Sequence, residues 1–193
     1  SSPQEVPPAL STGRAARAAV HYIVLVLEPG QIFASRYRVL RHIAEGGMGA
    51  IFEAEHTATE RRVALKLLFP HIMSVVSARK KFELEAKISA RVNSPNIVEV
   101  LDAGFDEASK SPFLVMELLE GQTLAHHVHD QGPLGIDQAL PLLQQVAAGL
   151  DAAHGYKENG TPKPIVHRDL KPENLFLARE HGALVVKILD FGI

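Results

Sequence analysis

The sequence predicts an α+β fold in two parts, in which strands dominate the first part and helices the second. Three runs with alternating apolar residues, at 37–44, 51–55 and 62–68, follow one another with short polar connections, which is typical of an antiparallel meander. Residues 136–154 instead repeat apolar side chains at helical spacing. The order of strands first and helices second indicates two lobes rather than alternating βαβ units.

The first part also contains one predicted helix and two further strands. The helix fits residues 77–92, where Phe82 and Ala86 share an apolar face, and the polar Asn-Ser-Pro-Asn stretch at 93–96 ends it. Strands at 97–101 and 113–116 follow it and bring the predicted sheet to five strands.

The second part is predicted to be mainly helical. A short helix at 123–129 precedes the long helix at 136–154, and Pro141 lies in the first turns of the long helix, where a missing backbone donor is tolerated. Short strands are expected at 174–177 and 185–189.

The ends of the two parts are set by changes in composition. Residues 1–30 are rich in Pro, Ser and Ala without a sustained period, so we interpret them as a disordered leader or linker. The first lobe is then expected at about 31–119 and the second at about 120–193. The apolar run at 20–27 is shorter than the roughly 20 residues that cross a bilayer.

Composition excludes several classes of function. The 193 residues carry a formal net charge of −2, which gives no basic surface for nucleic acid. The chain has no cysteine, so a disulfide framework and thiolate metal sites are absent, as is typical of a reducing compartment. We therefore expect a cytoplasmic domain without nucleic acid partners, although a membrane anchor could lie elsewhere in a longer protein.

Two features of the first part could contact phosphates. The glycine-rich segment EGGMG at 45–49 lies between two predicted strands, where backbone N–H groups can point at a phosphate, but a tight hairpin has the same pattern. Lys66 ends the strand segment VALK, one hairpin later, and Glu85 on the predicted helix could pair with it. A lysine and a glutamate at such positions could equally be solvated surface residues.

The deciding signal is a pair of segments, VHRDLKPENL at 166–175 and VKILDFG at 186–192. They resemble the catalytic loop and the metal-binding segment of protein kinases, and the glycine loop, VALK and Glu85 precede them in that family's order. The chain is similar to the bacterial branch of the eukaryotic-like serine/threonine kinases over about 31–193. The resemblance implies a two-lobed protein-kinase-like fold, ATP and Mg²⁺ as cofactors, and Ser or Thr of proteins as substrates.

The resemblance also implies a role for each catalytic residue. Asp169 orients the substrate hydroxyl and accepts its proton, and Lys171 reaches the γ-phosphate, as is typical of serine/threonine kinases. Asn174 and Asp190 are expected to bind Mg²⁺.

The remaining implied roles belong to nucleotide binding. Lys66 is expected to contact the α- and β-phosphates while Glu85 positions it, and Met116 is expected at the gatekeeper position before the hinge. The residues expected to contact the nucleotide or its metal are Ala44, Glu45, Gly46, Gly47, Met48, Gly49, Ile51, Ala64, Lys66, Met116, Glu117, Leu119, Asn174 and Asp190.

The sequence departs from the family pattern at three places. Ala44 replaces the first glycine of the phosphate loop, which predicts a looser fit to the nucleotide. A polar insertion at 157–164 is expected to be a flexible surface excursion. The chain ends just after Asp190-Phe191-Gly192, so the second lobe is incomplete, and Leu143 and Leu150 on the long helix are expected to be partly exposed. This chain is therefore expected to be a weakly active or inactive kinase by itself.

Two alternatives stay open. The chain could be a truncated, catalytically inactive module that binds nucleotide or another protein. His126, His127 and His129 could also suggest a metal site, although their helical spacing directs the rings to different faces. We expect His154 to pack in the core and His167 to support the catalytic loop.

Overall fold

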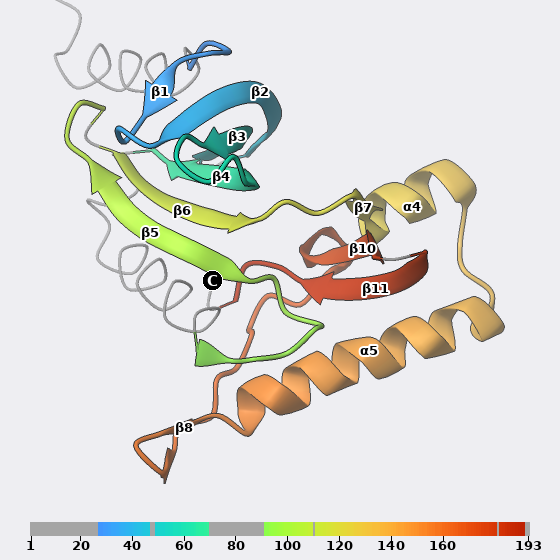
Figure 1. The fold of residues 1–193 in the computed structure, drawn as a ribbon. Helices are drawn as coiled ribbons and strands as arrows, with labels where there is room; N and C mark the ends of the chain where they lie inside the picture. The colour runs from blue at the N-terminus through green and yellow to red at the C-terminus, as the bar shows by residue number, and fades with distance from the viewer. Residues whose placement is uncertain (1–26, 47–48, 70–90, 110, 181, 192–193) are drawn as a thin grey trace, which may run out of the picture.

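The structure is a computed structural model that describes residues 27–46, 49–69, 91–109, 111–180 and 182–191. The predicted leader and the predicted helix at 77–92 therefore lie almost wholly outside the described residues. Figure 1 shows a curved sheet, followed by a small second sheet that separates it from the long helix. The two lobes expected from the order of strands and helices are thus present.

The first sheet has six antiparallel strands in the order β1-β2-β3-β4-β6-β5. Its strands are β1 (Ile32–Phe33), β2 (Tyr37–Gly46), β3 (Gly49–His56), β4 (Arg62–Leu68), β5 (Val100–Asp106) and β6 (Ser111–Glu117). The prediction of five strands missed β1, which has only two residues and pairs with the start of β2. Ala34 and Ser35, both at positive φ, turn the chain between these two strands.

The strand predicted at 97–101 lies further along the chain than expected. β5 begins at Val100, and Ile97 instead forms an isolated parallel bridge with Ile188 in the second lobe. The apolar residues at 97–98 therefore join the two lobes rather than extend the first sheet.

The alternating side chains of the first sheet form two apolar clusters. Phe52, Leu65 and Phe113 lie on one face and are almost fully buried in the main core of this lobe. Ala64 and Leu114 lie on the other face, which looks toward the second lobe. This period-two division is what the sequence pattern predicts for a sheet covered on both faces.

The second lobe combines two helices with a three-stranded sheet. The strands expected at 174–177 and 185–189 are both part of this sheet, and only its third strand was not predicted. The sheet has the order β11-β10-β7. In chain order, the elements of the second lobe are β7 (Gly121–Thr123), α4 (Leu124–Gln131), α5 (Ile136–His154), a 3₁₀ turn η1 (Pro172–Asn174), β10 (Leu175–Glu180) and β11 (Ala183–Ile188). Thr123 caps α4 by accepting a hydrogen bond from the His126 N–H.

Helix α5 packs along β11 with one face. Leu142, Val146, Gly149 and Ala153 are buried on that face, beside the strand. Leu143, by contrast, is 57% exposed, while Leu150 is half-buried, as expected. The expectation that His154 packs in the core was wrong, because its side chain is exposed.

The insertion at 157–164 lies at the surface, as expected, and forms a two-stranded hairpin of β8 (Lys157–Glu158) and β9 (Thr161–Pro162). Asn159 and Gly160 make its turn, and both have positive φ. The Asn-Gly pair is the sequence signal for this turn type, and it was overlooked.

Among the described residues, no helix is both long and apolar enough to cross a membrane.

Candidate active site

Lys66 and Asp190 meet at the junction of the two lobes, although 124 residues separate them in the sequence. Lys66 lies on β4 opposite Ile51 and Leu114, and only 7% of it is exposed. Its Nζ forms an ion pair with Asp190 Oδ1. A buried ammonium requires a carboxylate partner, so this pair fixes the end of the second lobe's sheet against the first lobe.

Asp190 follows β11 with a backbone conformation that side chains rarely adopt. Its φ is +54°, in the left-handed region, where a non-glycine residue is strained. Leu189, just before it, donates its N–H to Asn174 O at 2.9 Å and accepts a hydrogen bond at its carbonyl from His167 Nε2, also at 2.9 Å. The segment that leads to Asp190 is therefore attached to the 167–174 loop through both the backbone N–H and the backbone carbonyl of Leu189.

His167 connects the 167–174 loop to the segment around Asp190, and so supports the loop as expected from the sequence. It is buried, and its Nδ1 accepts the Asp169 N–H at 3.3 Å while Nε2 donates to Leu189 O, an arrangement that requires the neutral ring protonated at Nε2. Its ring also packs against the buried ring of Phe191 at a centroid distance of 4.8 Å.

The Asp169 carboxylate is held by two neighbours in the same loop. Lys171 Nζ lies 2.9 Å from Oδ2, and Asn174 Nδ2 donates to the Asp169 carbonyl at 2.8 Å and to Oδ2 at 3.2 Å. The hydrogen bond from Lys171 lowers the pKa of Asp169, and the same contact raises the pKa of Lys171. Asp169 is therefore ionised at neutral pH.

The donor atoms of Asn174 and Asp190 fit a hard cation such as Mg²⁺. The two bonds from Asn174 Nδ2 to Asp169 leave Oδ1 as the atom that can coordinate, and Asp190 contributes carboxylate oxygens. Mg²⁺ prefers oxygen ligands of this kind and takes few of them from the protein.

The residues expected around the adenine belong to one apolar cluster on the lower face of the first sheet. Ala64 and Met116 are buried in it, opposite one another on β4 and β6, and the partly buried Ile51 and Leu119 pack against them. The sheet thus presents an apolar surface beside Lys66.

The described residues of the phosphate loop occupy the ends of β2 and β3. Ala44, Glu45 and Gly46 are exposed at the end of β2, and Gly49 starts β3. A Cβ on Gly49 would lie 1.9 Å from Leu67 O, so only glycine fits there. Gly47, Met48 and Glu85 lie outside the described residues.

Comparison with known proteins identifies the family. The family model described as "Protein kinase domain" matches residues 37–193. The chain belongs to the protein kinase family. Its relatives include the serine/threonine-protein kinase pkn2 of Myxococcus xanthus, 38% identical over 84% of this chain, and the probable serine/threonine-protein kinase PknB of Lactococcus lactis, 34% identical over 87%.

A solved kinase domain supports the same assignment. The crystal structure of the Mycobacterium tuberculosis PknI kinase domain matches with a TM-score of 0.73 and 30% identity, over 87% of this chain and 64% of that one. The chain spans only 18% of pkn2 and 25% of PknB. These findings place the chain among the bacterial eukaryotic-like serine/threonine kinases and confirm the fold that the motifs predicted.

One group of charged residues in this kinase fold was not predicted. Lys187 on β11 is nearly buried, with its Nζ 3.0 and 3.2 Å from the Glu117 carboxylate and 3.0 Å from Glu180. Glu117 ends β6, the strand that leads into the second lobe, and its carboxylate also accepts the Glu99 N–H at 2.9 Å. Burial lowers the pKa of Lys187, but the bonds to Glu180 and Glu117 outweigh it and raise that pKa.

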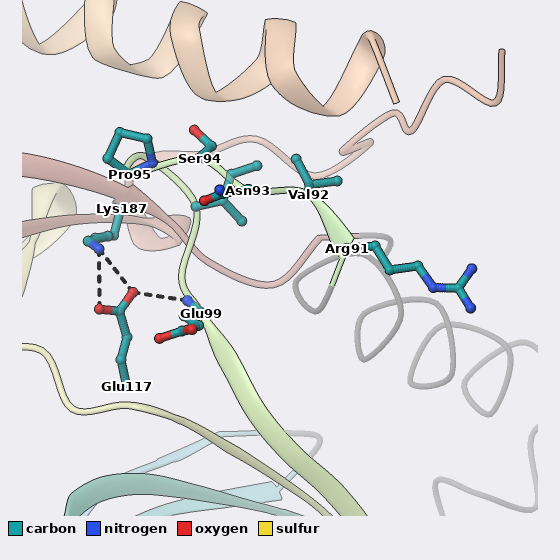
Figure 2. Close-up of a pocket in the computed structure, with 9 residues that line it drawn as sticks. Arg91, Val92, Asn93, Ser94, Pro95, Glu99, Glu117 and Lys187 are labelled. Carbon is teal, nitrogen blue, oxygen red and sulfur yellow. Dashed lines mark hydrogen bonds and ion pairs between the residues drawn. The ribbon is translucent and has the colours of Figure 1, made fainter. Parts of the chain in front are cut away.

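Lys187, Glu117 and Glu99 line a cavity of about 540 Å³, together with Ile97 and residues 91–95. Figure 2 shows Lys187 and Glu99 converging on Glu117 at its edge. Sequence reasoning missed Lys187 because a lysine between apolar strand residues usually extends to solvent.

The three histidines of α4 do not converge on one point. His126 and His129 lie 3.5 and 3.1 Å from Asp130, whereas His127 contacts Gln122. The described part of the chain contains no group of three His, Cys, Asp or Glu residues that could hold a metal ion.

Proposed function

We propose that this chain is the ATP-binding and catalytic part of a serine/threonine protein kinase, which transfers the γ-phosphate of ATP to Ser or Thr hydroxyl groups of proteins. The observation that carries the proposal is the contact between Lys66 and Asp190, next to a catalytic loop that presents an ionised Asp169. Phosphoryl transfer depends on positioning and on neutralisation of charge, which are the tasks that such an arrangement can perform.

Lys66 is proposed to bind the α- and β-phosphates. Its ammonium contacts Asp190, so the residue proposed to bind the phosphates lies next to a residue proposed to hold the cation. Glu85 is proposed to orient Lys66, and the loop from Ala44 to Gly49 to cover the phosphates.

Asp169 is proposed to accept the proton of the substrate hydroxyl. The hydroxyl oxygen forms a bond to the γ-phosphorus of ATP while the bond between the γ-phosphorus and the β-phosphate oxygen breaks, which releases ADP. Lys171 lies in the same loop, with its Nζ 2.9 Å from Asp169 Oδ2, and is proposed to bind the γ-phosphate. Its charge would stabilise the transferred group.

Asn174 and Asp190 would hold Mg²⁺, through Oδ1 of the amide and the carboxylate. The chemistry that Mg²⁺ would supply there is neutralisation of the charge on the phosphates. The hydrogen bonds of Leu189 to Asn174 O and to His167 Nε2 connect the two segments that carry these residues.

The adenine is proposed to pack against Ile51, Ala64 and Met116 and to hydrogen bond with the backbone of the hinge. The N–H of Glu117 already donates to Glu99 O at 3.0 Å, so the Glu117 carbonyl and the Leu119 backbone are the proposed partners. We further propose a cytoplasmic location, where ATP and Ser/Thr protein substrates are available.

Transfer of radiolabelled phosphate from ATP to casein, with Mg²⁺ present, tests this proposal. The full-length protein should label casein, and its Asp169→Ala variant should not, while ATP binding persists in the variant. Binding of Mg²⁺ and ATP without transfer by the wild type would favour the inactive nucleotide-binding module instead. Equal labelling by both proteins would contradict the role of Asp169.

A further inference from the structure

We propose that Gln145 of α5 is a positioning residue that fixes Asp190 through the outer edge of β11. The inference rests on the proposed role of Asp190 in binding the cation, but its structural step concerns only residues described here. β11 is an edge strand, because the sheet order is β11-β10-β7. The free edge of such a strand leaves backbone groups that require other partners.

Gln145 and the segment 96–98, which joins the two lobes ahead of β5, supply these partners. Gln145 Oε1 accepts the Val186 N–H at 2.8 Å, and its Nε2 donates to Leu184 O at 3.3 Å. Asn96 continues the ladder, since its side chain donates to Val186 O at 3.0 Å and its carbonyl accepts the Ile188 N–H at 2.8 Å. The Val98 N–H then donates to Ile188 O at 3.1 Å.

Gln145 also orients the next member of this ladder. Its Oε1 lies 3.2 Å from Asn96 Nδ2, so one amide oxygen holds both the strand and the side chain that follows along the edge. One turn later on α5, the absence of a side chain at Gly149 lets the helix approach β11, because a Cβ there would lie 2.8 Å from Ile188 Cδ1. Helix α5, the segment 96–98 and strand β11 are therefore in direct contact with one another.

The ladder ends one residue before the strained segment of the active site. After Ile188 come Leu189, whose backbone N–H and carbonyl bond to Asn174 and His167, and Asp190 at φ +54°. A backbone in that conformation persists only where its surroundings hold it. Loss of the Gln145 bonds should therefore loosen Leu189 and let Asp190 depart from Asn174.

The test compares Gln145→Met with Gln144→Met in the full chain. Methionine preserves the length of the side chain and removes its hydrogen bonds, and Gln144 is its exposed neighbour on the same helix. Gln145→Glu is the conservative variant, because a carboxylate retains the acceptor for the Val186 N–H. Amide hydrogen exchange at Leu189 reports the segment without any nucleotide, and the ratio of ATP dissociation constants in EDTA and in Mg²⁺ reports the cation site.

In Gln145→Met we expect Leu189 exchange to accelerate about tenfold and the Mg²⁺-dependent gain in ATP affinity to fall about fivefold, the equivalent of one hydrogen bond. ATP binding in EDTA should be unchanged, Gln145→Glu should show smaller effects, and Gln144→Met none. Unchanged Leu189 exchange in a folded Gln145→Met would overturn the inference, as would equal losses of ATP binding with and without Mg²⁺. If the wild type gains nothing from Mg²⁺, the proposed function fails, and Leu189 exchange alone decides the positioning step.

Discussion

Replacing Lys187 by methionine tests the charged contact between the end of β6 and β11. Methionine preserves most of the apolar stem but leaves the carboxylates of Glu117 and Glu180 without the ammonium that lies 3.0 Å from each. Removing one partner of a buried ion pair costs about 3–5 kcal/mol, and a charge-assisted hydrogen bond contributes about 1.5–3 kcal/mol. Both carboxylates keep some contact with water, at 20% and 37% side-chain exposure, so we expect a loss of about 2 kcal/mol in unfolding free energy.

The assay is urea denaturation at pH 7, with Lys163→Met as the matched control. Lys163 also pairs with a glutamate, Glu158, but its side chain is 65% exposed, and the same substitution there should leave the unfolding midpoint unchanged. In the double variant Lys187→Met/Glu117→Gln, the loss should be smaller than the sum of the single losses by about 1 kcal/mol, because the neutral amide no longer needs the ammonium.

The pH dependence follows from the raised pKa of Lys187. A raised folded-state pKa means that the stabilisation is complete below the unfolded value of about 10.4 and is lost as pH rises through the folded value. The difference between wild type and Lys187→Met should therefore be constant from pH 6 to about pH 9. The reasoning is refuted if Lys187→Met unfolds at the same urea concentration as Lys163→Met, or if the two single losses add without coupling.

Three further predictions follow from the same geometry. Lys171→Met should raise the pKa of Asp169 toward its ordinary range, as measured by ¹³C NMR titration of the carboxyl group, and an unchanged pKa would show that Lys171 is not the cause of the shift. Gly149→Ala should lower the unfolding free energy by about 1–3 kcal/mol, because its Cβ would lie 2.8 Å from Ile188 Cδ1, and a stabilised variant would mean that the helix and strand separate freely. Glu158→Gln should leave the thermal midpoint unchanged because its ion pairs are exposed. A clear drop in the midpoint would show that the ion pairs of the 157–162 hairpin stabilise the fold.

Much of the first lobe could be predicted from the sequence because its strands have regular alternation and short connections. The strand 62–68 was predicted at its observed bounds, and the register that places Lys66 on the lower face follows from its period. The two-residue β1 was missed because alternation cannot be detected over so short a length, and β5 was misplaced because Ile97 is buried by the second lobe instead of by the sheet.

The candidate site was found through motifs and not through periodicity. Nothing in the local pattern brings Lys66 to Asp190, since that contact depends on how the two lobes meet. The kinase motifs predicted that both residues bind the same nucleotide but not that they form an ion pair. Contacts without a motif escaped prediction for the same reason. Lys187 and Gln145 look like ordinary surface residues in the sequence, and only the packing of α5 and the hinge against β11 gives them partners.

The central claim is that Lys66 and Asp190 bind the same magnesium-bound nucleotide. Calorimetric titration of the protein with ATP, once in Mg²⁺ and once in EDTA, tests this claim most directly. The wild type should bind ATP more tightly with Mg²⁺, Asp190→Asn should lose that gain, and Lys66→Met should weaken binding under both conditions. An Asp190→Asn protein that gains as much from Mg²⁺ as the wild type would contradict the claim.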